Sequence, residues 1–385
     1  MLMCVLAALA AGPAAQEPEG TTSTAEIRRL IEKMAADDFA GQYASGKLAE
    51  VGGAAVTALI EALGHRVPRV RYWAIAALSS IGDERAVPAI QQRLKEDGDS
   101  TVRAVAVWHL GRWFDRDDVR QAVMATLDDK DPYVRGWAFR VIQHKRHAGA
   151  LPRLMKLLGS QDEAVRYSAL RAIAEVQGEG AIPLLVKALQ EDADPEVRAA
   201  AVFHLGQWFD RAEVREVILR TLDDKDKYVR GWALNVVTEK RCVEALPQAT
   251  ALLESDDEQV RFDALRAVAV LKGPDAVDFL KETLGKDPSA LVREAALRSS
   301  TVIEPPTPRS AEVLMRGLSD EVQELRELAS ALLRKGFGKD FGFQADGAVE
   351  DRQKAVQRWE EWYRQNSGAL RWDAEARAFV TPQPQ

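Results

Sequence analysis

Short apolar stretches at helical spacing alternate along the chain with Asp-rich turns, and this pattern predicts pairs of helices. The segments ALPRLMKLL (150–158) and AIPLLVKAL (181–189) have proline in the first turn, where its missing N–H costs little. The turn then leads into a second amphipathic helix such as EAVRYSALRAIAEV (163–176), whose first amides an aspartate can cap. One hairpin cannot bury both apolar faces, so we expect the hairpins to stack into a continuous core.

A Val-Arg pair marks the second helix of each unit and recurs at a nearly constant period. The intervals between successive pairs are 32, 32, 31, 32, 32, 31 and 32 residues. An aspartate precedes most of these valines by three positions and an alanine follows by four, so that Val and Ala share one buried helix face. The pairs begin at Val70, Val102, Val134, Val165, Val197, Val229, Val260 and Val292, and Leu325-Arg326 is a weaker copy.

These features resemble the HEAT-repeat family, in its short bacterial form related to phycobilisome-lyase repeats. The motif D-x-x-V-R-x-x-A-x-x-x-L is carried by Asp162, Val165, Arg166, Ala169 and Ile173, and the resemblance covers about residues 54–335. It implies an all-α fold, a right-handed α-solenoid of about nine helical hairpins.

The resemblance also implies a ladder between successive turns, in which each Asp caps its helix and accepts a bidentate bond from an Arg. Val67 takes the place of the Asp in the first unit, which argues against a rung there. The predicted ladder residues are Asp131, Arg135, Asp162, Arg166, Asp194, Arg198, Asp226, Arg230, Asp257 and Arg261.

The regions outside the repeats divide the chain further. Residues 1–15 are apolar and uncharged, and we expect them to be a signal peptide for export to the periplasm or beyond, with a cytoplasmic protein as the alternative. A linker and a capping helix, TAEIRRLIEKMAADDF, occupy residues 16–53. The HEAT-like solenoid (54–303) is followed by a Pro-rich break (304–309), a last hairpin (310–335), and a loop, amphipathic helix and small hairpin tail (336–385).

A longer duplication overlies the repeat and carries most of the unusual aromatic residues. Residues 102–176 match residues 197–271 at 44 of 75 positions. At 100° per residue, Trp108 and its copy Phe203 point away from the buried alanine, although burial in the core is the alternative. Trp113, Phe114 and their copies are expected to fill the junction to the next repeat. Because Trp and Arg dominate protein interfaces, the candidate partner-binding residues are Trp108, Arg112, Trp137, Phe203 and Trp232.

Composition adds two restrictions. The 385 residues carry a net charge of −7, whereas nucleic-acid binders usually have a basic face, so no nucleic-acid partner is expected. Cys4 lies in the predicted leader, which leaves Cys242 as the one thiol of the mature chain and excludes a Cys-ligated zinc site within it.

Candidate chemistry is sparse. The resemblance extends to HEAT-type hydroxylases, which bind two irons through His-Glu pairs. None of the five histidines here precedes a glutamate. His144 and His147 have metal-ligand spacing but flank Lys145 and Arg146, which disfavour a cation. We therefore expect no catalytic residues, no metal and no cofactor.

Three classes of function follow from these observations. The first is a non-catalytic scaffold that binds a protein partner through an extended solenoid surface and has no transmembrane segment in the mature chain. The alternatives are a phycobilin-lyase-like or other HEAT-type enzyme and, with less support, a DNA-binding HEAT solenoid, against which the acidic composition argues.

Overall fold

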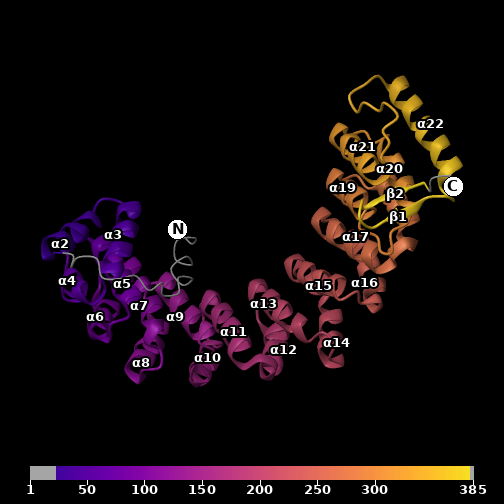
Figure 1. Ribbon diagram of the computed structural model, residues 1–385. Coiled ribbons are helices and arrows are strands. Elements are labelled where there is room, and N and C mark those ends of the chain that lie inside the picture. Colours follow the sequence, from indigo (N-terminus) through magenta and orange to yellow (C-terminus); the bar gives the residue numbers. More distant parts are fainter. Residues whose placement is uncertain (1–22, 382–385) are drawn as a thin grey trace. The chain divides into compact units, whose positions relative to one another are not determined.

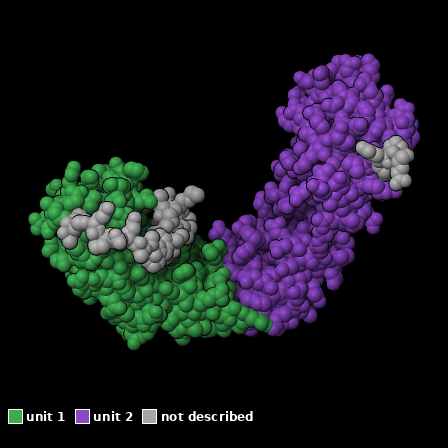
Figure 2. Space-filling view, in the orientation of Figure 1, with its two compact units in different colours: residues 1–181 green, residues 182–385 purple. Residues whose placement is uncertain are grey.

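The computed structural model describes residues 23–381, and these fold into helical hairpins in two compact units. Unit 1 ends at Ala181 and unit 2 begins at Ile182 (Figure 2). The predicted signal peptide, residues 1–15, lies outside the described residues. Within residues 23–381, no helix has both the length and the apolar composition that crossing a membrane requires.

Unit 1 contains five hairpins, each made of a first and a second helix (Figure 1). They are α2 (Thr24–Lys33) with α3 (Asp38–Val51), α4 (Val56–Ala62) with α5 (Pro68–Ile81), α6 (Val87–Glu96) with α7 (Ser100–Leu110), α8 (Asp117–Ala125) with α9 (Pro132–His144), and α10 (Leu151–Leu157) with α11 (Glu163–Gln177). Short 3₁₀ turns adjoin them: η2 (Gly52–Ala55), η3 (Glu84–Ala86), η4 (Gly111–Trp113), η5 (Thr126–Asp128), η6 (Ala148–Ala150) and η7 (Gly178–Ala181).

Unit 2 contains five more hairpins and a C-terminal cap. The hairpins are α12 (Ile182–Glu191) with α13 (Pro195–Leu205), α14 (Ala212–Thr221) with α15 (Lys227–Glu239), α16 (Leu246–Ala251) with α17 (Glu258–Lys272), α18 (Ala276–Lys286) with α19 (Ala290–Ser299), and α20 (Ser310–Gly317) with α21 (Gln323–Phe337). The cap is α22 (Val349–Asn366) with β1 (Arg371–Asp373) and β2 (Ala378–Val380); the 3₁₀ turns are η8 (Gly206–Trp208), η9 (Val243–Ala245), η10 (Leu252–Glu254) and η11 (Gly273–Asp275).

The repeated valine and alanine form the core, as the sequence predicts. Within each unit the second helices pack side by side, α3 to α11 in unit 1 and α13 to α21 in unit 2. The alanines that follow the valines by four positions have no exposed surface, which lets neighbouring helices approach closely. The fold is therefore an all-α solenoid of stacked hairpins, with only the two short strands in its described part.

The described residues contain ten hairpins, because the segment predicted to be a single capping helix is a full hairpin. TAEIRRLIEKMAADDF breaks after Lys33, and α3 begins at Asp38. Asp37 caps α3 by accepting a hydrogen bond from the Ala40 amide at 2.7 Å. Ala44 and Leu48 are fully buried at the positions of the repeat motif. The Val-Arg pair itself is replaced by Ala40 and Gly41, which is why the repeat search missed this unit.

An arginine ladder links successive repeats, and each rung joins an Arg to an Asp 26 or 27 residues later. The Arg103 Nε and Nη2 atoms donate to the two Asp129 carboxylate oxygens at 2.9 and 2.8 Å. The Arg103 Nη1 atom also donates to the Asp97 carbonyl of its own turn at 2.9 Å. The guanidinium thus closes one turn and binds the next. The other bidentate rungs are Arg71–Asp97, Arg198–Asp224, Arg261–Asp287 and Arg293–Asp320.

The acceptor in these rungs is not the aspartate that the motif suggested. Asp131 uses its side chain to cap α9, accepting from the Tyr133 amide at 2.9 Å, and the rung from Arg103 goes to Asp129, two residues earlier. The acceptor belongs to the next repeat. The repeat that carries Val70-Arg71 therefore does have a rung, Arg71–Asp97, although Val67 takes the place of its own aspartate. The predicted ladder residues Asp194, Asp226 and Asp257 likewise cap their helices.

The ladder is incomplete at one equivalent place in each copy of the duplication. Ser160 and Ser255 stand where the acceptor aspartate would be. Arg135 therefore makes a single bond to the capping residue Asp162, at 2.9 Å. Arg230 keeps its bond to the Asp224 carbonyl at 2.7 Å, but its buried Nε has no hydrogen-bond partner among the described residues. Arg166 donates to the Ser160 carbonyl at 3.0 Å, the same bond to its own turn that Arg103 makes to the Asp97 carbonyl.

The Pro-rich break does not interrupt the stacking. Helix α18 packs against α20, and α19 packs against α21, so the last hairpin joins the same core. The Glu304 carbonyl lies against Gly273, where a Cβ would approach it to 2.9 Å. Gly273 has a φ of +57°, so glycine is favoured there for both reasons.

The C-terminal segment covers the last repeat of unit 2, and the predicted small hairpin is present as β1 and β2. The Phe337 ring of α21 stacks on Phe379 at 5.2 Å, and Trp359 of α22 is only 1% exposed. The ladder ends here too, because the Arg326 Nε donates to the Ala345 carbonyl at 2.9 Å instead of to an aspartate. A polar backbone group thus replaces the next repeat.

Removing a complete rung should cost more stability than removing an incomplete one. Burial raises the pKa of Asp224, but hydrogen bonds from Arg198 and the Asp226 amide outweigh it and lower that pKa below its ordinary value. Arg198→Ala would leave this carboxylate unpaired, and we expect a loss of about 3 kcal/mol. Arg230→Ala in the same unit should cost about 1 kcal/mol, because no carboxylate loses its partner. Urea unfolding of both variants measures the difference, and equal losses would contradict the ladder's role.

Candidate interaction surface

One side of the second helices is not covered by other helices. On α9, Val134 and Ala138 are fully buried, whereas Tyr133 is 46% exposed and Arg140 is exposed. Tyr133, the half-buried Trp137 and Arg140 lie one residue before, three after and six after the repeated valine, and they share one helix face. We call this face of the second helices the open face. In unit 1, Figure 1 shows α9 and α11 along one side and their first helices, α8 and α10, along the other.

Three aromatic rings meet on the open face of unit 1. Trp108 of α7 and Trp137 of α9 pack edge to face, with ring centroids 5.3 Å apart. The Tyr133 ring contacts Trp137 from the preceding turn at 6.2 Å. The guanidinium carbon of Arg140 lies 5.0 Å from the centroid of the Trp137 ring, which is a cation–π arrangement. We call Trp108, Tyr133 and Trp137 the first cluster.

The duplication repeats this arrangement in unit 2. Phe203 of α13 and Trp232 of α15 have ring centroids 5.6 Å apart, and Tyr228 lies 6.3 Å from Trp232. Phe203 is 53% exposed and Tyr228 is 52% exposed. We call Phe203, Tyr228 and Trp232 the second cluster. Its rings are available to a partner because the repeat core does not use them.

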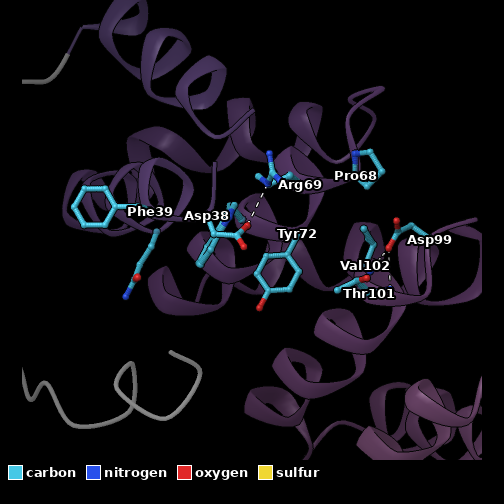
Figure 3. Close-up of a pocket in the computed structure, with 10 residues that line it drawn as sticks. Asp38, Phe39, Pro68, Arg69, Tyr72, Asp99, Thr101 and Val102 are labelled. Atoms are coloured by element: carbon cyan, nitrogen blue, oxygen red, sulfur yellow. Dashed lines mark hydrogen bonds and ion pairs between the residues drawn. The ribbon is translucent and has the colours of Figure 1, made fainter. Parts of the chain in front are cut away.

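A cavity of about 650 Å³ opens near the beginning of the unit 1 open face, between the N-terminal parts of α3, α5 and α7. Figure 3 shows Phe39, Arg69, Tyr72 and Thr101 around it. Phe39 is 82% exposed. The Arg69 Nε donates to Asp38 at 3.2 Å, and the indole of Trp73 lies against Gly41, where any Cβ would collide with it. The cavity therefore has an aromatic lining and an ion pair within it.

The chain matches known proteins in a way that decides its family. A family model described as HEAT repeats matches residues 27–111, 119–206, 182–238, 214–301 and 246–334, which together make up most of the sequence. The chain belongs to the HEAT-repeat family. No curated protein matches the sequence of this HEAT-repeat protein at a significant level.

One of the similar solved structures, a chain with a TM-score above 0.5, supports the same fold. A chain of the complex of Kap95p with RanGDP is 14% identical, covers 80% of this chain and 50% of that chain, and has a TM-score of 0.56. The Escherichia coli protein YibA is 19% identical over 73% of this chain and 97% of that chain, with a TM-score of 0.43. The CpcE–CpcF phycocyanin lyase complex from Nostoc is 22% identical over 68% of this chain and 99% of that chain, with a TM-score of 0.32. At 14% identity, the likeness to the chain of the Kap95p complex concerns the fold alone.

Four of the five candidate binding residues of this HEAT-repeat protein meet in pairs, Trp108 with Trp137 and Phe203 with Trp232. Arg112 is exposed but lies elsewhere, beside the C-terminal Gly82 of α5, where a Cβ would come within 2.6 Å of its Nη2. Tyr133 and Tyr228 were missed by the sequence analysis. Their spacing of four residues before Trp137 and Trp232 was the signal that could have found them.

Other aromatic residues named from the sequence serve the core. Trp113, Phe114 and Phe209 are at most 7% exposed, in agreement with a role at the junction between repeats, and Trp208 is half-buried.

The His144 and His147 rings pack against aromatic side chains, and Cys242 is buried. The His144 ring lies 6.2 Å from Trp108, whereas the His147 ring packs on Phe114 at 5.1 Å, so the two histidines contact different aromatic residues. Cys242 is buried, and burial raises the pKa of its thiol. Among residues 23–381, no three His, Cys, Asp or Glu side chains lie together in a way that could hold a metal ion.

His109 follows Trp108 of the first cluster on α7. Burial lowers the pKa of His109 from 6.5 to about 4, so the fold favours the neutral ring. This stabilisation is complete above the ordinary pKa and is lost as the pH falls from 6.5 towards 4. In the duplicate, His204 is only 2% exposed.

Acidification should therefore destabilise the wild type more than a variant without this imidazole. We expect wild-type stability to fall by about 2 kcal/mol more than that of His109→Gln between about pH 7.5 and about pH 5. Urea unfolding at both pH values measures this difference. Parallel loss in the two proteins would mean that His109 is protonated in the fold.

Proposed function

We propose that this HEAT-repeat protein is a non-catalytic scaffold that binds a protein partner through its open face. The observation that carries the proposal is the pair of aromatic clusters, whose exposed rings include Tyr133, Phe203 and Tyr228. Exposed groups of large apolar side chains on otherwise polar surfaces are typical of protein-interaction sites. Aromatic residues that present a large rigid area are also the residue types that contribute most to binding.

The duplication supports the same reading. One cluster lies in each unit, 95 residues apart in sequence, and both keep the tyrosine, the tryptophan and a further ring at equivalent positions. Two linked anchors on one chain gain affinity by effective concentration. A partner with an extended or repeated segment would benefit from this arrangement.

Loss of one ring in each cluster should abolish partner capture without unfolding the chain. The test compares the double variant Trp108→Ala plus Phe203→Ala with the wild type, each immobilised and exposed to the envelope fraction of its own organism. We expect capture to fall by about tenfold or more, because each ring is an anchor. Circular dichroism should remain helical.

The matched control is Met155→Ala plus Val243→Ala, which removes exposed apolar side chains outside both clusters. Capture by this control should equal that of the wild type. If the aromatic double variant stays folded and captures the same partner equally well, the binding surface lies elsewhere. If it unfolds, Trp108 and Phe203 belong to the core.

We also propose that the protein is exported, on the basis of the apolar, uncharged residues 1–15. The mature chain should begin near Gln16 and be recovered outside the cytoplasm. N-terminal sequencing of the native protein measures this directly. An intact Met1 on protein from the cytosolic fraction would refute export and would leave the scaffold proposal untouched.

A further inference from the structure

The two aromatic clusters keep the same ring positions but differ in the charges around them. From this difference we propose that the first cluster binds an acidic segment of the partner, one that carries aromatic or aliphatic side chains between its carboxylates. The inference rests on the proposed scaffold function and adds the chemistry of the partner. It concerns the open face of α7, α9 and α11 in unit 1.

The open-face positions of α7, α9 and α11 can be compared with their copies on α13, α15 and α17. Arg140 beside the first cluster is replaced by Asn235 beside the second. Two neutral residues of the first copy, Thr101 and Ser168, become acidic in the second, as Glu196 and Asp263. Both copies keep one further arginine, at positions 171 and 266. The first copy therefore carries a positive balance on these positions and the second a negative one.

The next turn of α9 and α11 leaves this difference unchanged, because it adds one carboxylate to each copy. In the first copy these positions hold His144 and Glu175, and in the second copy Glu239 and Val270. Glu175 is the one carboxylate among these positions of α7, α9 and α11. The two copies have thus kept their rings while their charges diverged, which is expected if the clusters contact different parts of a partner.

The two arginines of the first copy are available to a ligand. The Arg140 guanidinium stacks on Trp137, and the Arg171 guanidinium lies 5.5 Å from the ring centroid of Tyr167. Within residues 23–381, neither Arg140 nor Arg171 forms a hydrogen bond or an ion pair with a side chain of the protein. A guanidinium that stacks by its face keeps the N–H groups of its edge free for a bidentate carboxylate.

The acidic residues near the first cluster do not neutralise these arginines. Asp129 is held by both donors of Arg103. Asp131 caps α9, and Asp162 caps α11 and accepts from Arg135. These carboxylates lie at the N-terminal ends of the helices and are engaged there. Arg140 and Arg171 outnumber Glu175 on the open face of α7, α9 and α11, so its charge balance stays positive.

The positions of the arginines set the spacing of the ligand. Arg140 and Arg171 come from α9 and α11, which pack as neighbours. Packed helix axes are about 8–10 Å apart, which an extended chain spans in about three residues. We therefore expect carboxylates about three residues apart, with an apolar side chain next to the carboxylate at Arg140, on the α7 side, that contacts the rings of Trp108 and Tyr133. A nucleic acid would need a longer basic track than two arginines provide.

The test uses three fluorescently labelled synthetic peptides and the full chain. One peptide has Glu at every third position with Phe and Leu between; the other two carry Gln or Lys in place of Glu. Fluorescence anisotropy should give the tightest binding for the Glu peptide and the weakest for the Lys peptide. Arg140→Asn, which installs the residue of the second copy, should weaken the Glu peptide about fivefold and leave the Gln peptide unchanged.

The reciprocal change provides the matched control. Asn235→Arg should strengthen binding of the Glu peptide by a similar factor, because it gives the second cluster the arginine of the first. Tyr133→Ser, at an exposed position, should weaken the Glu and Gln peptides together, since it removes ring area and not charge. Circular dichroism of each variant shows that it is folded.

The outcomes separate this inference from the scaffold function. If Gln and Lys peptides bind as tightly as the Glu peptide and Tyr133→Ser weakens all three, the open face binds protein but the acidic preference is wrong. If no peptide binds, or if Tyr133→Ser and Phe203→Ser change nothing, the acidic-segment inference fails, whereas the scaffold proposal is still decided by the capture experiment with Trp108→Ala plus Phe203→Ala. If a single-stranded oligonucleotide displaces the Glu peptide and binds more tightly, the arginines serve phosphates and the inference is overturned.

Discussion

The fork of hydrogen bonds from the repeated arginine is the interaction on which the rest of the fold depends. Each such Arg donates to carbonyls of its own turn and, where the rung is complete, to both oxygens of an aspartate in the next repeat. It therefore fixes the shape of one hairpin and the register of the following one at the same time. Packing of Val and Ala against neighbouring helices is non-directional, whereas the planar fork permits only one relative placement of two turns. The rings of each cluster come from successive second helices, so their meeting depends on this register.

Much of this architecture could be predicted from the sequence, because the period of the Val-Arg pair reports directly on helices that repeat one packing problem. The first hairpin was not predicted, because Ala40 and Gly41 occupy the positions at which the other repeats have the Val-Arg pair. The choice of acceptor in the ladder escaped for a different reason. Two aspartates stand two residues apart in the turn, and only the three-dimensional path shows that Asp131 faces its own helix while Asp129 faces Arg103.

The candidate surface was predictable in part. Helical geometry correctly set Trp108 and Phe203 apart from the alanine face, but it could not say that each ring would meet a tryptophan of the following helix. That meeting depends on the offset between neighbouring helices, which no single helix encodes. Arg112 was predicted to bind a partner because of its residue type and its aromatic neighbours in the sequence, but it lies over the end of α5. The charge difference between the copies, by contrast, is already legible in the sequence once the open-face positions are known.

The missing aspartates at Ser160 and Ser255 give the solenoid a mechanical pattern. A complete rung resists the separation of two turns with two charge-assisted bonds, whereas the joint after Arg135 has one such bond and the joint after Arg230 has no carboxylate bond from that arginine within the described residues. We therefore expect the joint after Arg135 and the joint after Arg230 to bend more easily than joints that have a complete rung. The two helices of each cluster are joined by a complete rung. We therefore expect each cluster to keep its internal geometry when the neighbouring joint bends.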